Sequence, residues 1–231
     1  MKSYVIHLIR HGLTVANKEG RYAGQTDYPI CPEGEEALLA LKEEYEYPQA
    51  DAYFVSPLTR CRETLNILYD IPPAIEVPDL RECNFGDWED KTARELSSDP
   101  VFIEWMEKGG IVTPPNGENS DDFSKRVCGA FEALVEGMMR SRIFEAVIVA
   151  HGGTLMSILA AYGLPKASLQ DWLCANGCGY SIRINMSMWL NSKLFEVYDK
   201  IPQGVDPRMS DEQLEMFQPS AEFSDESGND Q

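Results

Sequence analysis

An apolar run near the start of the chain, residues 4–9, stops abruptly at Arg10, His11 and Gly12. The run is rich in β-branched residues, which predicts a buried strand of a parallel sheet. Polar side chains at the carboxyl end of such a strand face the ligand crevice of an open α/β sheet. Arg10 offers a planar fork that suits phosphate oxygens, and Gly12 lets the backbone turn tightly. The sequence therefore predicts an α/β fold with an anion site where this strand ends.

A second strand exit far along the chain repeats this design, because the apolar residues 146–150 run directly into His151 and Gly152. The chain has three histidines, and two of them stand beside glycine at the end of an apolar run. The third, His7, lies within the first run and is predicted to be structural. We expect His11 and His151 to share one crevice at the edge of the sheet.

Five short motifs in a fixed order resemble the histidine phosphatase superfamily, the phosphoglycerate-mutase-like proteins. Each motif is weak evidence by itself, whereas the five in this order are strong evidence. The match covers most of residues 1–200. They are Arg10-His11-Gly12, Ser56-Pro57-Leu58-Thr59-Arg60 with Thr64, Leu80-Arg81-Glu82 with Phe85-Gly86-Asp87-Trp88-Glu89, Pro115-Asn116-Gly117-Glu118, and Ala150-His151-Gly152-Gly153.

We predict one α/β domain over residues 1–204, with three α/β/α layers and a mostly parallel central sheet. Residues 92–142 form a largely helical insertion in this prediction and are a candidate lid over the catalytic end of the sheet. Residues 205–231 are acidic and polar, so we expect a partly mobile tail, with a docked helix over residues 209–217. Helices are predicted over residues 33–45, 57–69, 92–96, 101–108 and 120–140, and strands over residues 52–55, 73–77, 180–185 and 188–198.

The formal charge of −18 argues against nucleic acid and anionic membranes as partners. A small phosphorylated metabolite is the expected partner, and the pocket must then gather positive charge locally, for which Arg10, Arg21 and Arg60 are the candidates. The six cysteines are scattered, so we predict reduced thiols and no metal or other cofactor. With no visible signal peptide or membrane-spanning run, a cytoplasmic location is expected.

The residue types predict phosphoryl transfer through a histidine nucleophile. A neutral imidazole is a competent nucleophile near pH 7, and attack by His11 on phosphorus would give a phosphohistidine. The neighbouring Arg10 disfavours the imidazolium and anchors phosphate. Arg10, Arg60 and His151 could surround the phosphoryl oxygens without a metal ion. Asn17 is predicted to donate a further hydrogen bond.

The resemblance implies further roles for residues of the motifs and of the loop after the first strand. Glu82 would protonate the leaving group, with adjacent arginines expected to lower its pKa and a bound phosphate dianion to raise it. Arg21 and the backbone amide of Gly24 would help to hold the phosphoryl group. Gly152, beside His151, is also assigned to substrate binding.

Three other interpretations use the same residues. A metal site of His11, Glu82 and His151 is disfavoured because two neighbouring arginines would oppose a divalent cation. A mutase would pass the phosphoryl group to a second hydroxyl, but the residues after Glu82 resemble the phosphatase branch. A catalytically silent phosphate-binding or scaffold module would keep the fold without turnover, and the intact set of polar groups argues against it.

Four positions depart from residues that are common in the family: Leu13 replaces Glu or Gln, Ala16 replaces an aromatic residue, Asp90 replaces Gly, and Asn119 replaces Ser. None of these changes removes a proposed catalytic group. They do prevent transfer of a substrate from any relative, so the particular phosphomonoester stays open.

Overall fold

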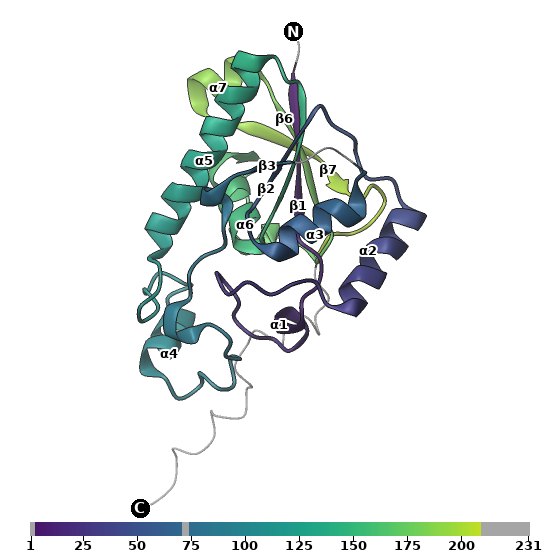
Figure 1. Cartoon of the computed structure of the whole chain (residues 1–231). Helices are drawn as coiled ribbons and strands as arrows, with labels where there is room; N and C mark the ends of the chain where they lie inside the picture. Colours follow the sequence, from purple (N-terminus) through teal and green to yellow (C-terminus); the bar gives the residue numbers. More distant parts are fainter. Residues whose placement is uncertain (1–2, 71–73, 209–231) are drawn as a thin grey trace, which may run out of the picture.

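The computed structural model describes residues 3–70 and 74–208, and its centre is a seven-stranded sheet in the order β3-β2-β4-β1-β6-β7-β5 (Figure 1). β1 pairs in parallel with β4, as β2 does with β3 and β4, and as β5 does with β7. Of the strand pairs in the described residues, only β1–β6 and β6–β7 are antiparallel, so the predicted mostly parallel sheet is confirmed. The strands are β1 Tyr4–Arg10, β2 Ala52–Val55, β3 Ile75–Glu76, β4 Glu145–Ala150, β5 Gly163–Leu164, β6 Gly179–Ile184 and β7 Phe195–Ile201.

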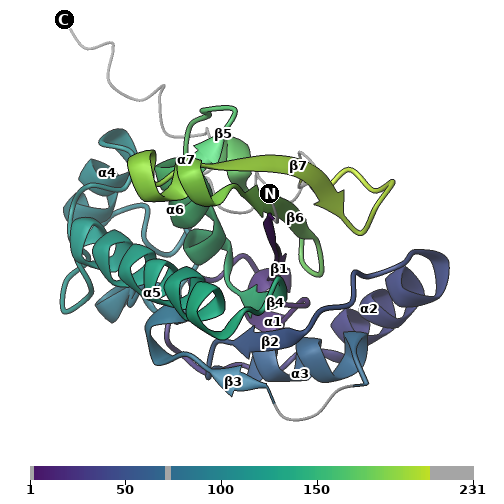
Figure 2. The same cartoon turned by 90° about the horizontal axis from the view of Figure 1, so that it is seen from above.

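Helices cover both faces of the sheet, which confirms the three-layer prediction (Figure 2). Successive residues of a strand point to opposite faces. Leu8 of β1 accordingly joins the core under α5 and α6, whereas Ile9 joins the core under α2 and α3. The helices are α1 Val15–Lys18, α2 Pro32–Glu44, α3 Thr59–Leu68, α4 Pro100–Glu107, α5 Ser120–Ser141, α6 Gly152–Tyr162 and α7 Met186–Ser192, with 3-10 turns η1 Pro78–Leu80, η2 Gly86–Trp88 and η3 Gln170–Trp172.

The register between β1 and β4 brings the two predicted strand exits together. Arg10 is the partner of Ala150, so His11 and His151 leave the sheet at the same level. β1 lies between β4 and β6, which places this exit in the middle of the sheet. His7 stays inside β1, where its ring contacts Ser181 Oγ at 2.8 Å and Glu145 Oε1 at 3.1 Å, as expected for a structural histidine.

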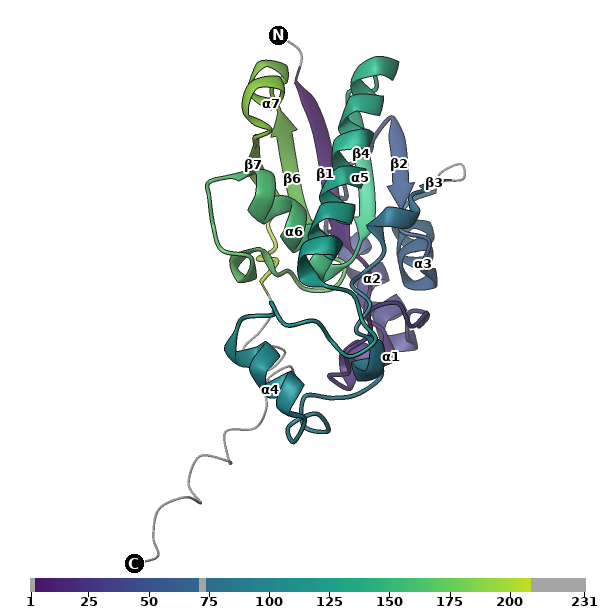
Figure 3. The same cartoon turned by 90° about the vertical axis from the view of Figure 1, so that its left-hand side faces the viewer.

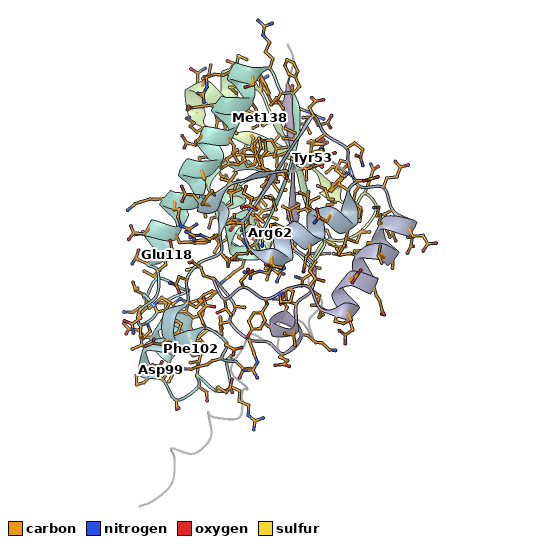
Figure 4. All side chains as sticks on the ribbon, in the orientation of Figure 1. Tyr53, Arg62, Asp99, Phe102, Glu118 and Met138 are labelled. Carbon is orange, nitrogen blue, oxygen red and sulfur yellow. The ribbon has the colours of Figure 1, made fainter. Side chains whose placement is uncertain are left out.

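The segment predicted as a lid divides between two places. α5 runs along one face of the sheet and is part of the outer layer, so it does not cover the catalytic end. α4 lies beyond the end of the sheet, on the same side as α1 (Figure 3). In Figure 4 Asp99 and Phe102 mark the α4 segment, and Glu118 marks the approach to α5. Of the predicted insertion, only the part around α4 lies at this end of the sheet, and its role as a lid stays a prediction.

α4 is held by a cluster of aromatic rings at this end of the molecule. The Tyr22 ring packs edge-on against Phe85, Phe102 and Trp105, at centroid distances of 5.4, 5.6 and 5.8 Å. Trp88 is fully buried and contacts Phe102 in the same cluster. The segment that contains α4 is therefore packed on the loops that follow β1 and Glu82.

The prediction of a helix over residues 92–96 is wrong, because these residues form turns. Thr92 and Glu95 bond to each other: the Glu95 carboxylate accepts from Thr92 N and Oγ1, and Glu95 N donates to Thr92 Oγ1. These reciprocal bonds are a capping box, which begins a helical turn, and Leu96 N donates to the Thr92 carbonyl at 3.1 Å. The helix does not continue, because Ser97 N and Asp99 N bond three residues back, to Arg94 O and Leu96 O. Leu96 is buried in the aromatic cluster, so packing fixes this compact turn.

The prediction of a strand over residues 188–198 is wrong in its first half. α7 occupies Met186–Ser192, and its N-cap Asn185 accepts hydrogen bonds from Ser187 N and Met188 N. This side chain satisfies amides that a helix start leaves free. Trp189 is fully buried, and the left-handed Lys193 ends the helix before β7 begins. The predicted docked helix at 209–217 lies outside the described residues.

Candidate active site

His11 follows β1 directly and is almost fully buried. Its Nδ1 lies 2.7 Å from the Gly12 carbonyl oxygen, which can only accept, so Nδ1 carries the proton and Nε2 keeps its lone pair. Gly12 N donates to Thr64 Oγ1 at 2.8 Å, which fixes the turn that carries the ring. Burial, followed by the charges of Arg60 and Arg10, holds the pKa of His11 well below its usual value. The ring is therefore a neutral base at pH 7.

His151 follows β4 and faces His11, with ring centroids 5.2 Å apart and planes at 62°. Arg60 Nε donates to His151 Nδ1 at 3.3 Å, so the ring proton is on Nε2, which donates to Ser56 Oγ at 2.7 Å. Burial and the charge of Arg60 also hold the pKa of His151 well below its usual value. The two imidazoles are thus both neutral in the free protein.

Arg60 lies in the first turn of α3, as predicted, and is 1% exposed. It donates to the carbonyl oxygens of Gly24 at 2.6 Å and Thr26 at 2.9 Å, in addition to His151. A guanidinium has five N–H groups. Within the described residues these bonds engage three of them, which leaves two N–H groups of Arg60 that could donate to an anion.

Arg10, the last residue of β1, is buried beside the same histidines. Its Nη1 donates to the Cys174 carbonyl oxygen at 2.5 Å, which anchors the guanidinium. A side chain on Gly152 would begin 3.5 Å from Arg10 Nε, so the first residue of α6 lies against the guanidinium. Burial lowers the pKa of Arg10, yet it stays a cation at neutral pH.

Glu82 lies on the loop after η1 and is half-buried. One carboxylate oxygen accepts from Cys83 N at 2.9 Å and the other from Gly153 N at 2.8 Å. Burial raises the pKa of Glu82, and this effect exceeds the opposing effects of the two amides and of Arg60 and Arg10. The arginines do lower the pKa of Glu82, as expected, but desolvation, which that expectation did not include, outweighs them. A raised pKa suits a proton donor.

The structure does not bring Arg21 to this group. Its guanidinium contacts the carboxylates of Glu19 at 2.7 Å, Glu95 at 3.5 Å and Asp90 at 3.9 Å, and donates to the Asp90 carbonyl. These contacts form a partly exposed surface cluster, so Arg21 is left out of the proposed site. The Gly24 amide is engaged too, since it donates to the Glu89 carboxylate. Gly24 contributes through its carbonyl, which holds Arg60.

Asn17 ends one hydrogen bond away from the backbone of His11. Its Oδ1 accepts from Thr14 Oγ1 and from Asn176 Nδ2, and the same Asn176 Nδ2 donates to the His11 carbonyl at 2.9 Å. Asn17 also closes a capping box with Thr14 at the start of α1. These bonds use the side-chain oxygen of Asn17 as acceptor, so its Nδ2 is the group that could donate to a ligand.

Four functional contacts were missed in the sequence. Ser56 and Glu89 lie inside the quoted motifs but received no role there. Asn176 stands in a loop with no distinguishing pattern. Arg126 of α5 pairs with Glu118 through both nitrogen–oxygen contacts, at 2.9 and 2.8 Å, and donates to the backbone before Glu82. A charge on an amphipathic helix gives no signal of such a clamp, because most are solvent-facing.

Three of the four departures from the family pattern, those at Ala16, Asp90 and Asn119, fit their surroundings in the structure. Asp90 has a φ of +64°, a left-handed conformation that glycine adopts at least cost, and its carboxylate accepts from the Tyr28 hydroxyl. Asn119 is the N-cap of α5 and accepts from Asp121 N, a role that serine fills equally well. Ala16 is fully buried in α1, so the small residue fits the space present.

The group as a whole can bind and transfer an oxyanion. Two guanidinium groups and two neutral imidazoles meet where β1 and β4 end, and Glu82, a carboxyl group of raised pKa, lies on the loop after η1. Within residues 3–70 and 74–208, no cluster of three or more His, Cys, Asp or Glu side chains is arranged to hold a metal ion. No helix in the same residues is both long and apolar enough to cross a membrane.

Known proteins are similar to this chain in sequence and in fold. A family model described as the histidine phosphatase superfamily (branch 1) matches residues 6–195. The adenosylcobalamin/alpha-ribazole phosphatase of Salmonella typhimurium is 31% identical over 183 residues, covering 77% of this chain and 89% of that protein. The crystal structure of the alpha-ribazole phosphatase from Shigella flexneri has a TM-score of 0.71 and 29% identity, covering 84% of this chain and 94% of that one. The crystal structure of a phosphoglycerate mutase from Thermus thermophilus has a TM-score of 0.62 and 29% identity, covering 87% of this chain and 99% of that one.

Proposed function

Because the chain belongs to branch 1 of the histidine phosphatase superfamily, we propose that it hydrolyses a small phosphomonoester through a phosphohistidine on His11. The observation that carries the proposal is the state of that ring. Nε2 of His11 is unprotonated, since Nδ1 bonds to the Gly12 carbonyl and since burial, followed by the charges of Arg60 and Arg10, keeps the pKa of the ring low. A nucleophile with cations beside it is what attack on a phosphate dianion requires.

In the first step His11 Nε2 forms a bond to phosphorus while the ester P–O bond breaks. The electron pair of that bond goes to the leaving oxygen, which takes a proton from Glu82. Arg10 and Arg60 neutralise the phosphoryl oxygens. The N–H of His151, which donates to Ser56 Oγ in the free protein, would have to exchange that partner to reach a phosphoryl oxygen. The products of this step are an alcohol, a phosphohistidine and an ionised Glu82.

In the second step water replaces His11 at phosphorus. Glu82, now a carboxylate, takes a proton from the water as its oxygen bonds to phosphorus and the P–Nε2 bond breaks. Inorganic phosphate leaves, and both residues return to their starting states. The raised pKa of Glu82 supports this cycle, because the group must gain and lose a proton near neutral pH.

The proposed substrate class is a phosphorylated metabolite of low molecular mass. The named relatives act on different compounds, and one of the similar structures is called a mutase. Inorganic phosphate released to water distinguishes a phosphatase from a mutase, in which the phosphoryl group passes to an acceptor hydroxyl. A panel of phosphorylated metabolites, each assayed for phosphate release with and without a hydroxy-acid acceptor, would identify the substrate.

The test is to trap the phosphoenzyme. The wild-type chain, treated with a chelator, is mixed with an aryl phosphate, quenched in alkali and weighed by mass spectrometry. We expect one phosphoryl group located on His11, and steady release of phosphate. His11→Ala should show neither, with an unchanged circular dichroism spectrum. A phosphoryl group retained in that variant, or no turnover by the folded wild type, would overturn the proposal.

A further inference from the structure

We infer that Glu89 is a positioning residue, whose carboxylate holds Arg60 and the Glu82 loop in a fixed relation. The inference rests on the proposed function, in which Arg60 binds the phosphoryl group and Glu82 carries the proton. Within the described residues, the Glu89 side chain makes no hydrogen bond to the histidines or to Arg60. Its action is through the backbone of two loops.

The first contact of Glu89 is with the loop that follows α1. Its two carboxylate oxygens accept from three consecutive backbone amides and one hydroxyl. These donors are Gly24 N at 3.1 and 3.0 Å, Gln25 N at 2.9 Å, Thr26 N at 3.2 Å and Thr26 Oγ1 at 2.7 Å. An ionised carboxylate has about four acceptor positions, and its hydrogen bonds are roughly twice as strong as neutral ones.

The same loop holds Arg60 from its other side. The amides of Gly24 and Thr26 point to Glu89, while their carbonyl oxygens accept from Arg60 Nη2 at 2.6 Å and Nη1 at 2.9 Å. Because one short stretch of backbone carries both sets of bonds, movement away from Glu89 would move the acceptors of Arg60. That would turn the guanidinium away from His11.

The second contact of Glu89 is with the segment that carries Glu82. Phe85 N donates to Glu89 Oε1 at 3.0 Å. The two loops also touch directly: Gln25 Nε2 donates to the Glu82 carbonyl at 3.4 Å, and a Cβ on Gly24 would lie 1.7 Å from the Cys83 carbonyl oxygen. The backbones approach so closely that only glycine fits. One carboxylate thus spans both loops.

Glu89→Gln tests the inference with little change in shape. An amide keeps one acceptor oxygen but turns the other into an NH2 group, which would face backbone N–H donors. We expect affinity for inorganic phosphate, measured by calorimetry, to fall about 10-fold or more, as for loss of hydrogen bonds to a charged group. The side-chain Nε–H signal of Arg60 in an NMR spectrum should also shift.

A matched control is Glu63→Gln. The Glu63 carboxylate accepts from Ile30 N at 2.7 Å, so it is tied to the same long loop without holding the acceptors of Arg60. This variant should bind phosphate within about 2-fold of the wild type. Thr26→Val removes one donor to Glu89, so we expect a smaller loss of phosphate affinity than in Glu89→Gln. This milder variant replaces Glu89→Gln in the test if Glu89→Gln fails to fold.

A double-mutant cycle separates positioning from general damage. In the Arg60→Ala background, Glu89→Gln or Thr26→Val should weaken phosphate binding by no more than about 2-fold further. An equal loss with and without Arg60, wild-type affinity in Glu89→Gln, or a wild-type chain that does not bind phosphate would overturn the inference. Phosphate binding with this coupling but without hydrolysis would overturn the proposed function and leave the role of Glu89 standing.

Discussion

The backbone amide of Gly153 donates to Glu82 Oε2 at 2.8 Å, so the proposed acid lies over the first turn of α6. A Cβ built on Gly153 would lie 2.5 Å from Glu82 Oε1, closer than any ordinary contact. The helix that begins after His151 therefore both supports the second histidine and sets the position of the carboxyl group. The φ of Gly153 is not in the left-handed region, so the backbone conformation does not require glycine here. The nearby carboxyl group of Glu82 does.

Gly153→Ala should displace Glu82 and lower the rate constant for an alkyl phosphate by about 10-fold or more, as expected when an acid is misplaced. Stability should not fall with it, because alanine favours a helix over glycine by up to about 1 kcal/mol. Gly129→Ala in α5 is the control, since nothing lies within 4 Å of its Cβ position. Equal rates in the two variants would show that Glu82 tolerates the shift.

Glu82→Gln should slow an alkyl phosphate by about 100-fold or more, and a nitrophenyl phosphate much less, because a good leaving group needs little acid. The rate for the alkyl ester should fall as pH rises through the raised pKa of Glu82, since the donor is then ionised. That basic limb should vanish in the variant. Rapid-quench measurement of phosphoenzyme formation from pH 5 to 8 gives both results. Equal slowing of the two esters would remove Glu82 from the role.

Arg60→Ala should lower the rate constant by about 100-fold to 1,000-fold, the usual cost of one donor to the developing charge. Arg62→Ala is the matched control on the same helix. The Arg62 side chain is 46% exposed and pairs with Glu76 at 3.3 Å. An exposed pair contributes about 1 kcal/mol or less to stability. Comparable losses of rate in both variants would mean that helix α3, not the Arg60 guanidinium, was damaged.

The strand exits could be predicted because their signal is local. An apolar run that ends in His11 or His151 fixes both the strand and the edge at which the side chain emerges, and the β1–β4 register joins them. The net pKa direction of Glu82 could not be predicted, because it depends on how much protein packs around the carboxyl group. Pairings such as Glu89 with the Gly24 loop join residues 65 positions apart, and no local pattern encodes them.

Local patterns also failed where a cap or packing decided the outcome. Residues 188–190 have the composition of a strand, yet the side chain of Asn185 caps the start of a helix here. This helix carries Trp189 into the core, where its side chain is fully buried. Arg21 resembles a phosphate ligand by position in the motif order. Its carboxylate neighbours Glu19 and Glu95 neutralise it instead, which becomes visible only when the loops are placed in space.

Asp90→Gly and Asp90→Ala should differ in stability by about 1 kcal/mol in favour of the glycine variant, because a left-handed φ of +64° strains a residue with a Cβ. Both variants lose the bond from Tyr28, so their difference isolates the backbone. Urea unfolding measures it. Turnover should stay within about 2-fold of the wild type in Asp90→Gly, as for surface positions. Equal free energies of unfolding in the two variants would contradict this account of the position.

The free energy of unfolding should decrease as pH falls from 7.5 towards 5.5. Burial lowers the pKa of His7, His11 and His151 in the folded protein, whereas each titrates near 6.5 when unfolded. The unfolded chain then binds more protons below pH 6.5, so the stability present above that pH is lost on acidification, by at most about 1.4 kcal/mol per pH unit for each histidine. Glu82, with its raised pKa, acts in the opposite direction but is a single group. Urea titrations at pH 5.5, 6.5 and 7.5 measure the slope, and His11→Ala should reduce it. Constant or rising stability on acidification would show that these histidines are not held neutral by the fold.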